Sequence, residues 1–409
     1  MKRILAVLLA LALCCGAIPA ALADDAEAPA QTENQTEEAV PAPDALNTLT
    51  WDNLEKRVRE NNATVKMLQE TIESINATDY DKMKEDLRKQ LNQIASGQRL
   101  LLQFGQGDSY AYAAAEQAYS SLRETFDDLK DGNIQQDAAD TVRQLQNAQN
   151  QVIAGAESLY VALLEMQNSR ASLQRQLAAM DRTVAEMDLR YKMGQISALQ
   201  LHQVTNGRTA LVSGIATLDA KLDDYTAQME LMAGARQTGS LTLAEPPAVT
   251  DQQAAAMNYD KDLAAAKEQS YELYDAKNTL DDAKDDYWSN VGKYAPGFYK
   301  RESLEHTWQA AQYTYQNTVQ NFEIKFRTAY NAVADYRQAL TAKESALSLQ
   351  EETFQSMKLK YNQGTISKNA YLDAQDALES AKTDVATAKH NLFTAYRTYY
   401  WALHYGVLN

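Results

Sequence analysis

Apolar residues recur every seven positions over long parts of this chain, and this repeat limits the fold more than any other feature. It runs from Leu145 to Met187 in the first half and from Phe326 to Tyr361 in the second. A seven-residue apolar repeat sustained over many turns indicates helices that wind around one another with a left-handed supercoil. The stretch 145–191 would make a helix about 70 Å long. We therefore expect an all-α fold of long, antiparallel coiled-coil helices.

The distribution of proline supports the same fold and divides the chain. Proline is absent from Asp44 to Glu245, and after Pro247 only Pro296 remains. A stretch of this length that is rich in Ala, Gln, Leu, Glu and Lys is typical of helix. The segment RQTGSLTLAEPPAVT, residues 236–250, is the clear internal linker. We predict that it separates two internal repeats of helical hairpins, residues 47–235 and residues 251–409.

Each predicted repeat contains one copy of the same octet. RYKMGQIS at 190–197 and KYNQGTIS at 360–367 share a basic residue, a Tyr, a Gly at the same offset and a final Ile-Ser. Gly costs a helix interior about 1 kcal/mol relative to Ala, and the apolar repeat continues on both sides of each octet. We therefore expect each octet to be the turn of a helical hairpin.

The residues of these turns are the first candidate functional residues. The candidates are Tyr191, Gly194, Ile196, Ser197, Tyr361, Gly364, Ile366 and Ser367. Ile196 and Ile366 would be exposed on a lone hairpin, and exposed apolar tips favour a partner or a neighbouring tip.

Two further groups of residues follow from the sequence pattern. Alanine recurs every seven residues after the second octet, which lets a neighbouring helix approach closely. This stripe comprises Ala374, Ala381, Ala388, Ala395 and Ala402. An aromatic cluster falls outside the apolar repeat around Pro296 and Gly297, and both an interfacial or ligand-contacting loop and a packed turn remain open for it. The cluster comprises Tyr287, Trp288, Tyr294, Phe298 and Tyr299.

The N-terminal segment has the pattern of an exported protein. Lys2 and Arg3 precede an apolar run, and Ala-Leu-Ala at 21–23 offers a cleavage site, so we predict a signal peptide over residues 1–23. Residues 24–46 are acidic, contain Pro and have few large apolar groups, which predicts a disordered linker. No other apolar run approaches the ~20 residues that a membrane helix needs.

Removal of this signal would change both the cysteine content and the charge. The only cysteines, Cys14 and Cys15, would be lost, which excludes disulfides, thiolate metal sites and Cys nucleophiles. The formal charge would change from −16 to −18, with 37 basic and 55 acidic residues left after the loss of Lys2 and Arg3. This acidity argues against nucleic acid and anionic lipid as partners.

The sequence offers no pattern of a catalytic or metal site. Four histidines are present, and none is spaced to pair with another as metal ligands, so we expect solvated histidines or histidines that line an aperture. No nucleophile–base pair, carboxylate pair or phosphate-binding loop stands out. We predict no catalytic residues, no metal and no cofactor.

The chain resembles the TolC family of outer-membrane efflux ducts. In that family each half ends its ascending helix in an aromatic-x-x-Gly turn, a pattern that Tyr191 with Gly194 and Tyr361 with Gly364 match. Residues 371–406 resemble the family's C-terminal signature. The halves open with an acidic helix, which residues 49–66 and, more weakly, 259–280 match. The resemblance covers nearly all of residues 47–409.

The resemblance implies a function without catalysis. It implies a homotrimer that closes a hollow α-helical barrel, whose tips dock a periplasmic adaptor and an inner-membrane pump, in the outer membrane or periplasm. Family members carry membrane strands where this chain has residues 80–132, which read mainly as helix, and 287–300, which are too short for a membrane hairpin. We therefore expect little or no β structure. A non-conducting coiled-coil scaffold or binding module of the envelope is the alternative hypothesis.

Overall fold

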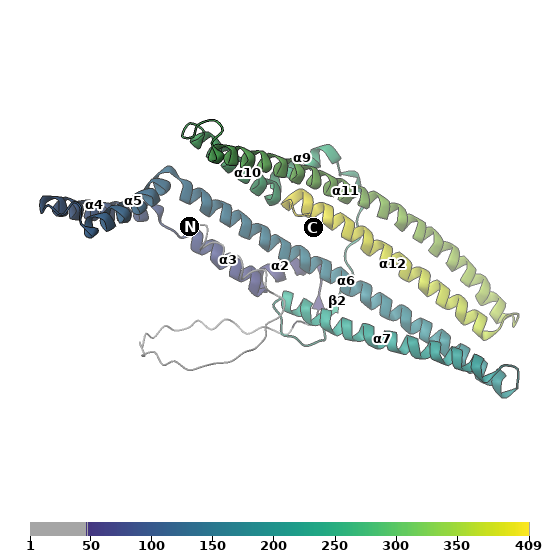
Figure 1. Ribbon diagram of the computed structural model, residues 1–409. Helices are drawn as coiled ribbons and strands as arrows, with labels where there is room; N and C mark the ends of the chain where they lie inside the picture. The colour runs from purple at the N-terminus through teal and green to yellow at the C-terminus, as the bar shows by residue number, and fades with distance from the viewer. Residues whose placement is uncertain (1–45, 47, 409) are drawn as a thin grey trace, which may run out of the picture. The chain divides into compact units, whose positions relative to one another are not determined.

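Four long helices form two antiparallel hairpins in the computed structural model, which describes residues 46 and 48–408 (Figure 1). Helix α6, Asn133–Lys192, turns into α7, Ala198–Met232, and helix α11, Tyr299–Asn362, turns into α12, Lys368–Tyr405. The long hairpins predicted from the seven-residue repeats are confirmed. The predicted signal peptide and all of the predicted acidic linker except Leu46 lie outside the described residues.

Shorter elements complete the fold. They are β1 Thr48–Leu49, α2 Trp51–Asn61, α3 Ala63–Asn76, α4 Tyr80–Gln103, α5 Tyr110–Asp131, β2 Thr242–Leu243, α8 Asp251–Ala255, α9 Tyr259–Gln269 and α10 Tyr271–Asn290. Residues 80–132, predicted to be mainly helical, form the hairpin α4–α5. The two strands pair in parallel, Thr48 opposite Thr242, and are the β structure of the described residues. Within residues 46 and 48–408, no helix combines the length and apolar character needed to cross a membrane.

The long helices form a layer in the order α7, α6, α12, α11. Helix α6 packs against α7, α11 packs against α12, and the two hairpins meet where α6 runs antiparallel to α12. We call this contact the α6–α12 seam. Helices α7 and α11 therefore form the two edges of the layer, each with one long neighbour.

Polar pairs along the seam fix how far each hairpin extends. Arg182, ten residues before the end of α6, binds Asp376, eight residues after the start of α12, with N–O 2.5 Å. Further along the seam, Glu157 of α6 binds Arg397 of α12. Along the seam, away from the tips, the paired residues lie progressively earlier in α6 and progressively later in α12, by similar numbers of residues. This is the register that an antiparallel pair requires. The two octet turns therefore end at the same level.

Two apolar cores lie at the end of the layer away from the octet turns. The first joins β1, α2, α3, α6 and the end of α7, and it includes Leu49, Leu54, Val58, Ile153, Tyr160 and Met229. Leu46 packs against it. The second joins α9, α10, α11 and α12, and it includes Ala266, Leu273, Phe322, Phe326, Leu392 and Tyr399. Each core thus belongs mainly to one hairpin and the short helices that precede it.

The two halves of the chain repeat one joint in detail. Asn62, with φ −67° and ψ 125°, ends α2 and caps α3; Ser270, with φ −67° and ψ 118°, ends α9 and caps α10. Gly234, with φ +63°, follows α7 and lies against the backbone of the first break. Gly406, with φ +64°, follows α12 and lies against Ser270 in the same way. The glycine after the second helix of each long hairpin, α7 or α12, thus packs on the break between two short helices.

Gly234→Ala is expected to destabilise the protein more than Gly194→Ala, although both glycines have positive φ. A non-glycine residue in this conformation costs about 1–2 kcal/mol at either site. At Gly194 nothing lies within 4 Å of the added Cβ, whereas at Gly234 the Cβ would lie 2.2 Å from the carbonyl oxygen of Asn61. Urea unfolding followed by circular dichroism measures both losses. Equal losses would contradict the close contact.

Tyr160 attaches the strand pair to α6. Its buried hydroxyl donates to the carbonyl oxygen of Ala244, 2.5 Å away, and the carbonyl oxygen of Leu49 lies 3.2 Å away. Ala244 follows β2, and Leu49 is the last residue of β1. Burial raises the pKa of Tyr160 to about 12.

The contribution of Tyr160 to stability is expected to depend on pH. Its pKa is near 10 in an unfolded chain and higher in the fold, so above about pH 10 the unfolded state loses a proton that the folded state keeps. The contribution is therefore complete below pH 10 and declines as the pH rises toward 12. Tyr160→Phe should be less stable than the wild type by about 1 kcal/mol at neutral pH. The difference in unfolding free energy between the wild type and this variant should narrow at alkaline pH. A difference that stays constant with pH would contradict this.

Candidate functional site

The first octet forms a helix end and a helix start in immediate succession. Gly194, with φ +71°, donates its N–H to the carbonyl of Tyr191 at 2.9 Å, and Gln195 donates to the carbonyl of Arg190 at 2.8 Å. These two bonds are the Schellman arrangement that ends helices at a glycine. The Ser197 hydroxyl then accepts from the N–H of Gln200 and caps α7.

The second octet repeats this geometry. Gly364, with φ +70°, donates to the carbonyl of Tyr361 at 2.9 Å, and Thr365 donates to the carbonyl of Lys360 at 3.0 Å. The Ser367 hydroxyl accepts from the N–H of Ala370 and caps α12. The recurrence of Gly and Ser in the octet therefore has a backbone explanation: one closes a helix and the other opens the next.

Apolar side chains are exposed around both turns, although they are not the ones that the sequence singled out. Ile196 and Ile366 are half-buried, so the prediction of their exposure was wrong. Each immediately precedes a helix cap, from which an apolar side chain commonly packs against the fourth residue of the helix. The exposed apolar residues are Leu189, Tyr191, Met193 and Leu199 at the first turn and Leu359 and Tyr361 at the second. We call this set the tip surface.

The alanine stripe lies in the packed part of α12. Ala374, Ala388, Ala395 and Ala402 are buried, and Ala381 is half-buried.

The residues of the aromatic cluster differ in their exposure to solvent. Tyr287 is buried and stacks on Trp308 with ring centroids 5.3 Å apart. Trp288, Phe298 and Tyr299 are exposed, and Tyr294 is half-buried.

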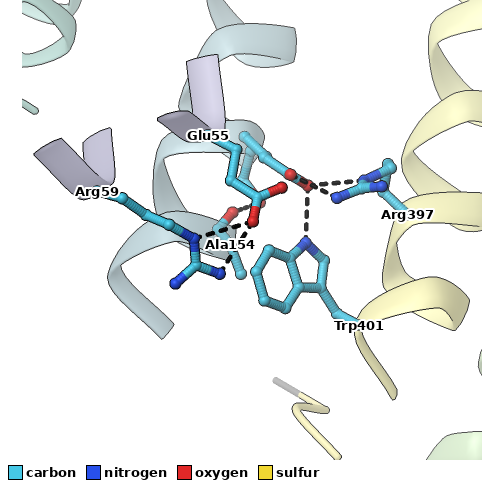
Figure 2. Close-up of polar contacts among 7 residues, drawn as sticks. Glu55, Arg59, Ala154, Arg397 and Trp401 are labelled. Carbon is cyan, nitrogen blue, oxygen red and sulfur yellow. Dashed lines mark hydrogen bonds and ion pairs between the residues drawn. The ribbon is translucent and has the colours of Figure 1, made fainter. Parts of the chain in front are cut away.

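A buried charge network holds the seam away from the tips. Glu157 of α6 accepts from Arg397 Nε at 2.8 Å and Nη2 at 2.5 Å, and from Trp401 Nε1 at 2.7 Å. Figure 2 shows Arg397 and Trp401 reaching from α12 to the same carboxylate. Burial raises the pKa of Glu157, and the hydrogen bonds from Arg397 and Trp401 oppose this rise. The carboxylate is fully engaged, so the network is suited to fixing the seam.

His390 forms a second network that the sequence did not indicate. It is buried, with Nδ1 2.6 Å from a carboxylate oxygen of Glu165 on α6 and Nε2 2.7 Å from one of Glu245 in the linker. The prediction of a solvated or aperture histidine was therefore wrong for this residue. Its partners are 225 and 145 positions away, so no local pattern could have revealed them. In the part of the chain described, no three His, Asp or Glu side chains converge as metal ligands.

Comparison with solved structures identifies the fold. The chain matches a membrane protein from Pseudomonas aeruginosa with a TM-score of 0.54 and 13% identity, over 91% of this chain and 96% of that one. It matches the outer-membrane channel OprN with a TM-score of 0.54 and 13% identity, over 94% of this chain and 99% of that one. No known protein family and no curated protein matches the sequence. The predicted resemblance to outer-membrane channels is thus confirmed in the fold.

Arg397→Met is expected to lower the free energy of unfolding by about 3–5 kcal/mol, because it leaves the buried Glu157 without its cation. The side chains of Glu157 and Arg397 are 5% and 17% exposed. The loss should shrink as the pH falls, because protonation neutralises the carboxylate whose pKa burial raises. Denaturant unfolding at several pH values measures it.

Arg190→Met is the matched control, because Arg190 pairs with Glu186 on the surface of α6. An exposed pair of this kind contributes less than about 1 kcal/mol. Similar losses for the two variants would contradict the importance of burial in the seam.

Proposed function

We propose that this protein is the channel subunit of an export system in the cell envelope, similar in mode of action to TolC. Three copies close into a hollow barrel of paired helices, and substrates pass along its interior. The observation that carries the proposal is the layer α7–α6–α12–α11, in which both edge helices expose apolar side chains. The fold likeness to the outer-membrane channel OprN supports it.

The edges of the layer have matching apolar residues. On α7, Val212 lies fourteen residues from the tip end and is 41% exposed. On α11, Leu349 lies thirteen residues from the tip end and is 66% exposed. A neighbouring copy whose α11 lies against α7 would bring these side chains to the same height. Burial of each exposed apolar area would favour that association.

Repetition of this contact gives a closed ring. The contact uses opposite edges of the layer, so it is heterologous and leads to a ring when the rotation between copies closes. With four long helices from each chain, three chains would give a wall of twelve helices. The residues of the chain would contribute through their positions, by forming the wall and the rim of the channel.

The tip surface is the proposed docking site for an adaptor. Both octet turns end at one level, so a ring of three chains would present six tips on one rim. The exposed side chains of Leu189, Tyr191, Leu359 and Tyr361 would offer apolar contacts to a periplasmic adaptor, which in turn receives substrate from an inner-membrane pump. We propose that these residues, together with Gly194 and Gly364, shape the rim.

A disulfide between α7 and α11 tests the ring. The variant Val212→Cys/Leu349→Cys, in a chain with Cys14→Ser and Cys15→Ser, should form cross-linked dimers and trimers on mild oxidation. In one chain α6 and α12 separate these helices, by roughly 25 Å for packed neighbours. A disulfide needs Cα atoms within about 7 Å, so a covalent link must join two chains.

The two single-cysteine variants are the controls, because each offers only one half of the expected pair. Both should give at most a minor dimer band and no trimer on a non-reducing gel. If the double variant stays monomeric at high concentration, the closed barrel is wrong, and a non-conducting envelope scaffold becomes the better account.

A further inference from the structure

The turn between α10 and α11 has a charge that is opposite to that of the chain. Residues 287–301 contain Lys293, Lys300 and Arg301 and no Asp or Glu, whereas the chain carries a formal charge of −16. Lys293 and Lys300 are exposed. We call residues 287–301 the basic turn. A local positive charge of this kind attracts an anionic surface even where the net charge of the protein does not.

Exposed aromatic side chains accompany these charges. Trp288 is 58% exposed and Tyr299 is 66% exposed, and Phe298 between them is exposed as well. Phe298 stacks on Tyr294, and the Lys300 ammonium lies 5.7 Å from the centre of the Tyr294 ring. Tyr287 is buried and packs on Trp308, and the exposed Trp288 lies edge-on to both of these rings. The rings on the outside therefore are not needed to fill a core.

The same residues are poor choices for starting a helix. The cap residue of α11 is Phe298, whose side chain accepts no hydrogen bond from the first turn. Lys300 and Arg301 lie in that first turn, where positive charge opposes the helix dipole, and Glu302 in the same turn offsets only part of this charge. Ser197 and Ser367, in contrast, cap the helices that follow the octets. Residues that locally oppose the fold are expected where function has selected them.

We propose that the basic turn binds the surface of an anionic lipid bilayer, with the aromatic rings at the level of the headgroups. Trp and Tyr prefer the interface between membrane and water, and clustered Lys and Arg bind anionic lipid. The overall acidity, which argues against anionic lipid for the chain as a whole, does not apply to this turn. Acidic residues flank it directly in the sequence, Asp285 and Asp286 on α10 and Glu302 and Glu305 on α11.

This attachment would be peripheral and sensitive to salt. Exposed charges are screened over about 10 Å at moderate ionic strength, so added salt should weaken binding. The inference does not depend on the proposed channel function, because it needs only the turn of one chain. A scaffold with the same turn would bind in the same way.

Co-sedimentation of the full chain with vesicles tests the proposal. We expect binding to phosphatidylcholine vesicles that contain phosphatidylglycerol and much weaker binding to phosphatidylcholine alone. Lys293→Gln/Lys300→Gln should lower the partition coefficient on the anionic vesicles roughly 30-fold, from the typical contribution of a lysine near such a surface. Asp285→Asn/Asp286→Asn should change binding in the opposite direction and strengthen it.

Lys66→Gln/Lys358→Gln is the matched control, because it removes two exposed lysines from α3 and α11 and changes the net charge equally. It should bind like the wild type. Circular dichroism checks that every variant keeps its helix content. Absence of vesicle binding, equal binding to both vesicle types, or equal losses in the two lysine variants would overturn the proposal. If the turn binds a protein partner and not a bilayer, vesicle binding would be absent.

Discussion

The α6–α12 seam is the contact on which the rest of this structure depends. Each long hairpin packs its own two helices, and the seam is the contact between long helices that makes one layer out of two hairpins. It lies between Arg182 with Asp376 near the tips and Glu157 with Arg397 near the apolar cores. It therefore sets both turns at the same level and leaves α7 and α11 as open edges. The proposed ring and the proposed rim both follow from this arrangement.

The polar pairs of the seam fix a register that apolar packing alone leaves open. A seven-residue apolar repeat would pack almost as well after a slide of seven residues, since the apolar stripes would still face each other. Such a slide would separate Arg397 from Glu157 and His390 from Glu165, leaving buried charges or polar groups without partners. Buried ion pairs add little net stability, but the cost of breaking one is large. The seam thus uses charge for register and apolar area for association.

The sequence alone predicted the parts of the fold that depend on local pattern. Heptads and the Gly of each octet indicated the long hairpins and their turns, because helix ends are decided by nearby residues. The break at Asn62 was not predicted, since it depends on contact with the end of α7, about 170 positions away. The burial of His390 was missed for the same reason. Side-chain exposure at the tips also depended on the folded turn, and Ile196 was misjudged accordingly.

The molar mass of the purified chain in solution, measured by light scattering with and without mild detergent, shows whether the layer of one chain is incomplete alone. We expect a particle of three chains, because the apolar edges of α7 and α11 need a neighbour. A monodisperse monomer at high concentration in both conditions would contradict it. The exposed side chains of these two edge helices would then need another explanation.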